Sequence, residues 1–294
     1  MHKELLKFLA CPICRTSITF DGKTADNRFV NGYLKCVRGH LYQVKEEMGL
    51  IKDAKLSAGE FEWRVDVADE SKYDEIQKQY NSYLNEDLRT ALKKLMDILI
   101  NSVIKSCLDT NNIVLDIASG MGRFVLQLAE KIPKDTIIIG TDVDEKPLRG
   151  AMNKAKKIGV YQKISLIVTD AKHLAFKDKA LSTVSSHFGF DNVPETVLAL
   201  KESFRVLKPD GKVIFSSVWL KEGSESIKIA EKYKVGQIAS ENRLKQTLKK
   251  TGFILDWFEE VYSGVWPYNP MDLLPVQGEE FSHVIVQIRK PKNA

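Results

Sequence analysis

Residues 113–124 combine an apolar run, an acid and two glycines in an order that can bind a nucleoside cofactor. The β-branched run is typical of a buried parallel strand, and Gly120 and Gly122 let the backbone approach a ligand where a Cβ atom would collide. A second apolar run, 136–142, ends in Asp142, at the spacing expected of a carboxylate that binds ribose hydroxyls. Because ligands lie at the carboxyl ends of parallel strands, we expect one cofactor to contact both strand ends.

The details of this loop favour S-adenosylmethionine over a dinucleotide. Dinucleotide-binding loops place a third glycine three residues after the second, where this chain has Val125. Asp116, just before the turn, would repel a pyrophosphate but attract the ammonium group of a methionine moiety. An ordinary strand-to-helix turn is the alternative interpretation of a lone glycine pair.

Three cysteines and one histidine have the spacing of a zinc site. Cys11 and Cys14 form a Cys-x2-Cys knuckle, and Cys36 and His40 form a Cys-x3-His knuckle. We predict that the four side chains bind one structural zinc ion, because a complete ligand set leaves no open position for catalysis. A redox pair or disulfide is the alternative, which a cytoplasmic chain disfavours. The fourth cysteine, Cys107, lies in an apolar helical stretch and is expected to be a buried small hydrophobe.

Length and composition limit the class of protein. A chain of 294 residues can hold one large α/β domain and a small module. The net charge is +5, and the first 55 residues hold most of it, with 10 Lys and Arg against 6 Asp and Glu. No apolar run reaches the roughly 18 residues of a membrane-spanning helix, and the start is too short and too charged for a signal peptide. We therefore expect a cytoplasmic protein with no membrane partner; the oligomeric state is not indicated.

The order of predicted elements indicates a Rossmann-like α/β fold with a doubly wound sheet. We expect a zinc-ribbon module over 1–52, a linker over 53–72 and a cofactor-binding domain over 73–294 that begins with a helix over 73–108. Strands then alternate with helices, which implies a parallel sheet, and the last two strands lack an intervening helix and should form an antiparallel hairpin at its edge. The seven expected strands are 113–117, 136–142, 164–169, 181–186, 212–218, 254–262 and 281–289, and the expected helices after 108 are 121–131, 145–158, 193–207 and 240–251.

With these motifs in place, residues 75–290 resemble class I S-adenosylmethionine-dependent methyltransferases of the ubiquinone- and menaquinone-type group. Residues 116–122 resemble the glycine loop of that family, 140–142 its ribose-binding acid, and 203–212 the helix-turn-strand that closes its central sheet. The resemblance implies that Asp170 and Ala171 bind the adenine. Residues assigned to the cofactor are Asp116, Ala118, Gly120, Gly122, Asp142, Val143, Asp170, Ala171 and His187.

The chain departs from the family pattern at two positions. Ala118 replaces the first loop glycine, which we expect to be tolerated only if its φ is not positive. Ser182 replaces the usual acid early in the fourth strand.

The methyl acceptor should lie over the end of the fourth strand, at residues 186–192. His187 is a candidate general base, because the ordinary pKa of histidine is about 6.5, close to neutral pH. Asp191 is the second candidate catalytic residue, with capping of a helix at Val193 as the alternative. The aromatic segment 266–271 could be a lid or a packed loop.

The first 52 residues resemble the zinc ribbon of tRNA-methyltransferase activators and of rRNA guanine methyltransferases. This resemblance favours a base in structured rRNA or tRNA as the acceptor. A small-molecule acceptor, with the ribbon and residues 61–83 covering its pocket, is the first alternative, and a non-catalytic cofactor-binding or docking protein is the second. In the RNA hypothesis, the phosphates would be contacted by Lys3, Lys7, Arg15, Lys35, Arg38 and Lys45.

Overall fold

Apolar β-branched runs form the central strands, as their sequences favour. The computed structural model describes residues 1–53, 71–108 and 113–294. In it, β5 (Ile113–Ile117) lies between β6 (Ile137–Asp142) and β8 (Leu181–His187), and β7 (Ile164–Val168) lies beyond β6. These four strands are parallel, so their carboxyl ends meet at one edge of the sheet. This edge is the place where the sequence predicts the cofactor site.

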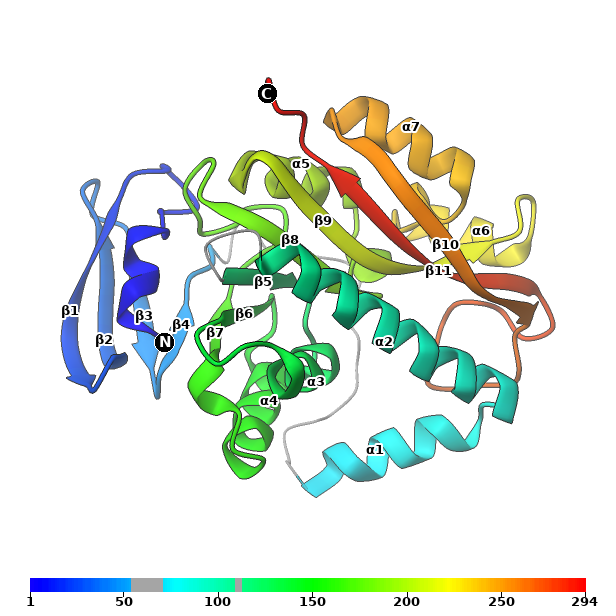
Figure 1. Ribbon diagram of the computed structural model, residues 1–294, viewed down its shortest axis with the longest axis horizontal. Helices are drawn as coiled ribbons and strands as arrows, with labels where there is room; N and C mark the ends of the chain where they lie inside the picture. The colour runs from blue at the N-terminus through cyan, green and yellow to red at the C-terminus, as the bar shows by residue number, and fades with distance from the viewer. Residues whose placement is uncertain (54–70, 109–112) are drawn as a thin grey trace.

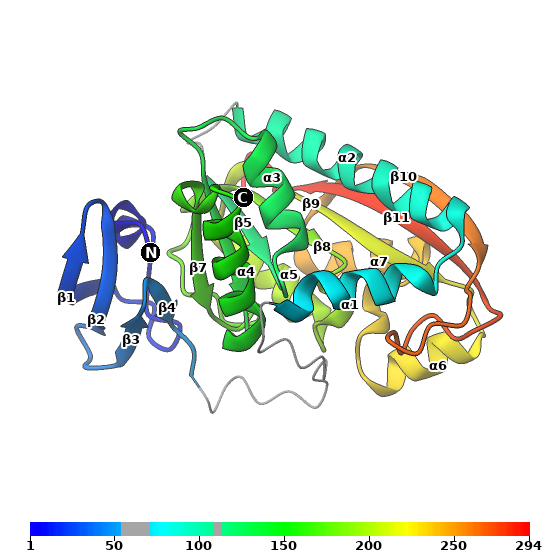
Figure 2. The ribbon, with the colours of Figure 1, turned by 90° about the horizontal axis from the view of Figure 1, so that it is seen from below.

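The sheet is larger than expected. Its strand order is β1-β2-β3-β4-β7-β6-β5-β8-β9-β11-β10 (Figures 1 and 2). Seven strands come from the carboxy-terminal part, but four N-terminal strands continue the sheet, since β4 pairs in parallel with β7. The seven-stranded sheet beside a separate ribbon is thus corrected to one sheet of eleven strands. Pairing with β4 covers the β7 edge, which would otherwise present unpaired backbone groups. The added strands are β1 (Ile18–Ala25), β2 (Arg28–Cys36), β3 (Leu41–Lys45) and β4 (Met48–Leu50).

The opposite side of the sheet ends in the expected antiparallel hairpin. β9 (Leu207–Leu220) is parallel to β8, whereas β11 (Glu280–Arg289) is antiparallel to β9. β10 (Ile254–Val265) pairs with β11 and forms the outer edge. The hairpin predicted from the missing helix is confirmed.

Helices cover both faces of the sheet because its strands alternate their side chains between two apolar cores (Figure 2). Ile113, Leu115 and Ile117 pack with α5 and α7, and Val114 packs with α2, α3 and α4. The N-terminal module adds Met1 and other residues to the first core. The helices are α1 (Ser71–Ser82), α2 (Glu86–Leu108), α3 (Arg123–Lys131), α4 (Glu145–Lys157), α5 (Thr196–Val206), α6 (Glu225–Lys232) and α7 (Glu241–Thr251).

Two helix predictions need correction, and one helix was missed. The continuous helix over 73–108 is two helices, because the Asn85 side chain accepts a hydrogen bond from the amide of Leu88 (2.8 Å) and caps a new helix. α5 begins three residues later than expected, at Thr196, and α6 was not predicted. Most of the predicted linker, residues 54–70, lies outside the described residues. Cys107 is buried in α2, as expected, and no described helix is both long and apolar enough to cross a bilayer.

Candidate active site and metal cluster

The loop between β5 and α3 has the conformation that its glycines allow. Gly120 (φ +51°) and Gly122 (φ +73°) both lie in the left-handed region. A Cβ atom at Gly122 would meet the Cβ of Ala151 in α4 at 2.7 Å, so this glycine also permits close packing between α3 and α4. A Cβ at Gly120 would meet no described atom within 4 Å. Gly120 therefore faces open space, where a ligand can approach.

Ala118 has a positive φ of +53°, contrary to the condition expected for its tolerance. A left-handed non-glycine residue costs roughly 1–2 kcal/mol. The neighbouring loop accommodates its methyl group at Gly189, where an added Cβ would lie 2.8 Å from the Cβ of Ala118 and 2.7 Å from the carbonyl oxygen of Ile117. Gly189 has an ordinary φ, so it is required for space rather than for conformation. The loops after β5 and β8 are thus fitted to each other.

Asp116 lies beneath the glycine loop and is 1% exposed. Its carboxylate accepts hydrogen bonds from the hydroxyls of Ser119 (2.6 Å) and Ser185 (2.8 Å). Burial raises the pKa of Asp116 to about 7. The geometry shows Asp116 anchoring the loop through Ser119, and its attraction for an ammonium group stays a prediction. Sequence reasoning missed both serines, although small polar residues within apolar runs were the available signal.

Asp142 joins the end of β6 to the glycine loop. Its carboxylate accepts hydrogen bonds from the amides of Gly120 (2.8 Å) and Asp144 (3.0 Å), and burial raises its pKa. The amide of Thr169 donates to the carbonyl of Asp142 (2.8 Å), which brings Asp170 to the same edge of the sheet. Predicted cofactor residues from β5, β6 and β7 therefore lie together. Val143 is exposed there, and Ala171 follows Asp170.

His187, at the end of β8, is in a poor environment for a general base. Its Nδ1 lies 2.9 Å from the hydroxyl oxygen of Ser216, and its ring packs 4.6 Å from that of Phe188. Burial, together with the charge of Arg123, lowers the pKa of His187 to about 3. The imidazole is therefore neutral and weakly basic near pH 7, and the structure argues against the expected proton-abstracting role.

Asp191 connects to β9 and does not cap a helix. Its carboxylate accepts hydrogen bonds from the hydroxyl of Ser217 (2.6 Å) and from the amide of Val218 (2.9 Å). Burial raises the pKa of Asp191 to about 7, in the range where a carboxylate can take up a proton from a substrate. Asp191 is thus a better candidate base than His187.

A pocket lies at the carboxyl ends of β8 and β9. Ring contacts connect it to the start of α3, since Phe124, His187, Phe188 and His283 follow one another with centroids 6.3, 4.6 and 5.0 Å apart. Trp266, from the predicted lid segment, is buried in its wall. Its lining residues are Tyr80, Leu92, Phe188, Asp191, Asn192, Val218, Leu220, Ala230, Val235, Ala239, Trp266, Asp272, Leu273, Leu274, Pro275 and His283. Among the described residues that line it there is no lysine or arginine.

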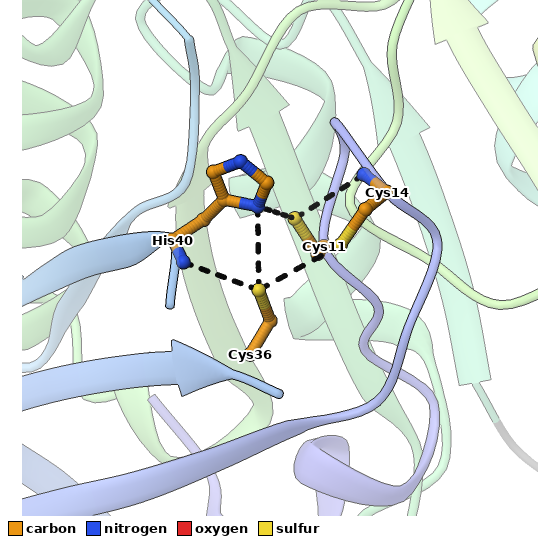
Figure 3. Close-up of side chains that lie close together, drawn as sticks. All are labelled: Cys11, Cys14, Cys36 and His40. Carbon is orange, nitrogen blue, oxygen red and sulfur yellow. Dashed lines mark hydrogen bonds between the residues drawn. The ribbon is translucent and has the colours of Figure 1, made fainter. Parts of the chain in front are cut away.

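The four predicted metal ligands converge between the segment before β1 and the turn from β2 to β3 (Figure 3). His40 Nδ1 lies 3.4 Å from the sulfur of Cys11 and 3.3 Å from that of Cys36, and the sulfurs of Cys14 and Cys36 are 3.6 Å apart. Tetrahedral zinc with ligand bonds of about 2.0–2.3 Å separates its ligands by roughly 3.5–3.8 Å. The Cys3His set therefore fits a zinc ion, while the metal itself stays a prediction.

Arg15, next to Cys14, connects this cluster to the cofactor side of the sheet. Its guanidinium donates to the carbonyl of Leu174 (3.0 Å) and to Glu202 (3.1 Å), whose other oxygen accepts from the amide of Leu174 (2.9 Å). Leu174 lies in the loop that follows Asp170. The Arg15 side chain therefore holds this loop, and its predicted contact with RNA phosphates stays a prediction.

Comparisons with known proteins agree with the fold. Two solved structures share it: the [4+2]-cyclase SpnF (TM-score 0.55, 20% identity, 67% of this chain and 80% of that chain) and a geranyl diphosphate methyltransferase in complex with S-adenosylmethionine (TM-score 0.51, 9% identity, 65% and 84%). At such identities the likeness shows the fold alone. The cyclase indicates that one fold serves more than one reaction.

Sequence comparisons identify the family. The ubiquinone/menaquinone biosynthesis C-methyltransferase of Rickettsia typhi is 39% identical over 129 residues, 42% of this chain and 51% of that protein. The corresponding protein of Rickettsia bellii is 32% identical over 182 residues, 60% of this chain and 67% of its own. The chain thus spans about half the length of the first relative. A model of the ubiE/COQ5 methyltransferase family matches residues 67–233, more than half of the chain. The chain therefore belongs to the ubiE/COQ5 methyltransferase family, which confirms at family level the methyltransferase expected from its sequence.

Proposed function

We propose that this protein is an S-adenosylmethionine-dependent methyltransferase that methylates a carbon atom of a small quinone-type molecule. The observation that carries the proposal is the largely apolar pocket at the carboxyl ends of β8 and β9, whose described lining residues include two aspartates but no lysine or arginine. Pockets of this kind suit small apolar ligands, whereas RNA phosphates need basic side chains. The names of the relatives also favour a quinone acceptor over the RNA acceptor expected from the ribbon.

The cofactor would lie across the ends of β5, β6 and β7. Gly120 provides the open backbone of the loop, and Asp142 is proposed to bind the ribose with the carboxylate that already accepts from Gly120. Asp170 and Ala171 are proposed to contact the adenine, with Val143 beside it. Asp116, Ala118, Gly122 and His187 would shape the loop and its surroundings.

Catalysis by this chain consists mainly of positioning and one proton transfer. S-adenosylmethionine, when bound, supplies the methyl group. Asp191 is proposed to accept the proton that the acceptor loses as its carbon gains the methyl group, so that charge balances. His187, which is neutral and hydrogen-bonded to Ser216, would fix the loop after β8 on the side that faces the acceptor. Exclusion of water by the apolar pocket would favour the transfer.

The N-terminal module is proposed to hold structural zinc through Cys11, Cys14, Cys36 and His40. The metal would stabilise the knuckle that carries Arg15 and, through it, the loop after Asp170. We further propose that residues 1–52 and 73–294 correspond to two evolutionary modules, although their strands share one sheet.

The test uses purified full-length protein and methyl-labelled S-adenosylmethionine. Separate reactions receive a quinone-containing lipid extract, total tRNA and rRNA, or a protein extract. We expect label in the lipid fraction, with loss of that label in the Asp191→Asn variant. Label in RNA would overturn the small-molecule acceptor. Cofactor binding without S-adenosylhomocysteine formation in any pool would favour the non-catalytic alternative.

A further inference from the structure

Two buried nitrogen atoms in the wall of the pocket lack a hydrogen-bond partner within the described chain. They are Nδ1 of His283 and Nε1 of Trp266, on side chains of residues that are only 2% and 3% exposed. Buried polar atoms in folded proteins are almost always hydrogen-bonded, so an unpaired one needs an explanation. Both residues line the same pocket, so a ligand bound there is a candidate partner for both atoms.

The two rings are held rigidly by the carboxy-terminal hairpin. His283 belongs to β11, and Trp266 directly follows β10. Phe281 packs against both, with centroids 4.9 Å from each ring, and the two rings are themselves 6.2 Å apart. Because neighbouring aromatic rings fix their orientations, the nitrogen atoms are positioned before a ligand arrives.

The chemistry of the pair selects a hydroxyl group. An indole nitrogen can only donate a hydrogen bond, whereas a neutral imidazole has one donor and one acceptor nitrogen. Burial lowers the pKa of His283 to about 3, which keeps its ring neutral. A hydroxyl group can accept from Trp266 and donate to His283 at the same time. No described lining residue is cationic, so an anionic group would gain no charge partner there.

Strained backbone at Phe188 points to the same place. Phe188 has a φ of +54°, which is costly for an aromatic residue. Its backbone N–H donates a hydrogen bond to the hydroxyl oxygen of Ser216 (3.0 Å), which helps to hold this conformation. This conformation places its ring between His187, on the cofactor side, and His283, on the pocket side. An acceptor held by His283 would therefore lie next to the residue that separates it from the cofactor loop.

We propose that Trp266 and His283 are specificity-determining residues that bind and orient the methyl acceptor through one of its hydroxyl groups. The inference rests on the proposed function, because it assigns the pocket to the acceptor.

Equilibrium dialysis of the full-length protein with S-adenosylhomocysteine tests the inference, using 1-naphthol, naphthalene and 1-naphthoate as probes. We expect 1-naphthol to bind at least fivefold more tightly than naphthalene, and 1-naphthoate to bind more weakly than 1-naphthol. Trp266→Phe and His283→Phe should each weaken 1-naphthol binding about five- to tenfold, since each removes one hydrogen bond, and should leave naphthalene binding within twofold.

Trp219→Phe is the matched control. The Nε1 of Trp219 is also buried and unpaired in the described chain, but its ring packs on Phe258 (5.0 Å) and does not line the pocket. This variant should bind all three probes like the parent protein. Thermal unfolding checks that each variant folds. If the His283→Phe variant does not fold, the Trp266→Phe variant alone tests the inference.

Equal binding of 1-naphthol and naphthalene by the parent protein would overturn the inference, as would unchanged 1-naphthol binding in the folded Trp266→Phe variant. A protein that binds no S-adenosylhomocysteine would instead contradict the proposed function. The two failures are therefore distinguishable.

Discussion

The cofactor side and the acceptor side of the sheet differ in how their polar groups are satisfied. On the cofactor side, Asp116 accepts from two hydroxyls and Asp142 accepts from two backbone amides. On the acceptor side, His283 and Trp266 each carry a nitrogen without a partner in the described chain. The two acids of the first side are thus held by the protein itself, whereas we propose that a ligand completes the hydrogen bonds of the two rings on the second side.

The two outer extensions of the sheet differ as well. The N-terminal module pairs with β7 over a short stretch, at Gly49, Leu50 and the amide of Ile51, and side chains such as Arg15 and Arg28 supply further contacts. The carboxy-terminal hairpin pairs with β9 continuously over residues 281–289. Backbone ladders tolerate changes of exposed side chains, so single substitutions should affect the N-terminal extension more.

Among changes to the N-terminal extension, loss of the metal should reduce the stability of the protein most. Cys36→Ser is expected to lower the free energy of unfolding by about 3 kcal/mol or more, because structural zinc sites contribute directly to folding. Since Cys36 belongs to the same apolar core as β5, the whole chain should unfold at a lower temperature in one transition. Zinc content and calorimetry measure this. The control variant Cys107→Ser, which alters a cysteine outside the cluster, should still bind zinc. The prediction would be contradicted if removing zinc from the parent protein left its free energy of unfolding unchanged.

Arg28→Met should be the next most damaging change. The Arg28 guanidinium is buried, donates to Glu47 (2.7 Å) and to the carbonyl of Ile164 (2.9 Å), and stacks 4.2 Å from the centre of the Tyr161 ring. Breaking a buried ion pair costs about 3–5 kcal/mol. The matched variant at the hairpin edge, Arg289→Met, breaks more exposed ion pairs and should cost about 0–1 kcal/mol in urea unfolding. Equal losses would remove the proposed difference between the two extensions.

Asp191→Asn should lower kcat/KM about 100-fold, the usual contribution of a general base. The pKa of Asp191 is raised to about 7, so kcat/KM of the parent enzyme should fall about tenfold per pH unit below that value and level off above it. The same raised pKa means that the neutral form stabilises the folded state, and that this contribution is lost as the pH rises from about 4 to 7. The variant should lack this pH dependence of the rate and lose only the part of the stability dependence that Asp191 contributes, because burial also raises the pKa of Asp116. A parent rate that does not change between pH 5 and 8 would exclude Asp191 as the base.

Arg15→Met should weaken cofactor binding about three- to tenfold, equivalent to roughly 1 kcal/mol for a lost hydrogen-bonding group. The reason is that Arg15 holds Leu174, in the loop after Asp170. Calorimetric titration with S-adenosylhomocysteine measures the change. Arg38→Met, an exposed arginine of the same module, is the control and should bind normally. Identical affinities in the two variants would show that the N-terminal module does not support the cofactor side.

Ala118→Gly should have the smallest effect, a gain of about 0.5–1 kcal/mol in unfolding free energy. Glycine relieves the left-handed strain of roughly 1–2 kcal/mol, and its greater freedom in the unfolded chain offsets part of that gain. Gly189→Ala, which would place a methyl group 2.8 Å from the Cβ of Ala118, should instead destabilise the protein. Destabilisation by Ala118→Gly would mean that packing against Gly189 outweighs the strain.

Much of the fold was predictable because it depends on local properties of the chain. Apolar β-branched runs became the parallel strands, and the missing helix after residue 262 became the hairpin. The acids predicted at strand ends do lie there, although their roles remain predictions. The break before α2 was missed because the apolar spacing continues through it, while Asn85 caps the new helix.

The acceptor side was less predictable because its residues come from distant parts of the chain. A single histidine in an apolar strand gives no signal of function, and His283 reaches the pocket only because β11 inserts between β9 and β10. The environment of His187 likewise depends on Ser216 and Arg123, which are remote in sequence.

The sequence alone determined the glycine loop, the acids at the ends of β5 and β6 and the Cys3His spacing, since each depends on neighbouring residues. Tertiary structure decided that the N-terminal strands extend the sheet, that burial raises the pKa of Asp191 and lowers that of His187, and that His283 and Trp266 line one pocket. The physical reason is that strand pairing, burial and electrostatic environment arise from contacts between residues far apart along the chain.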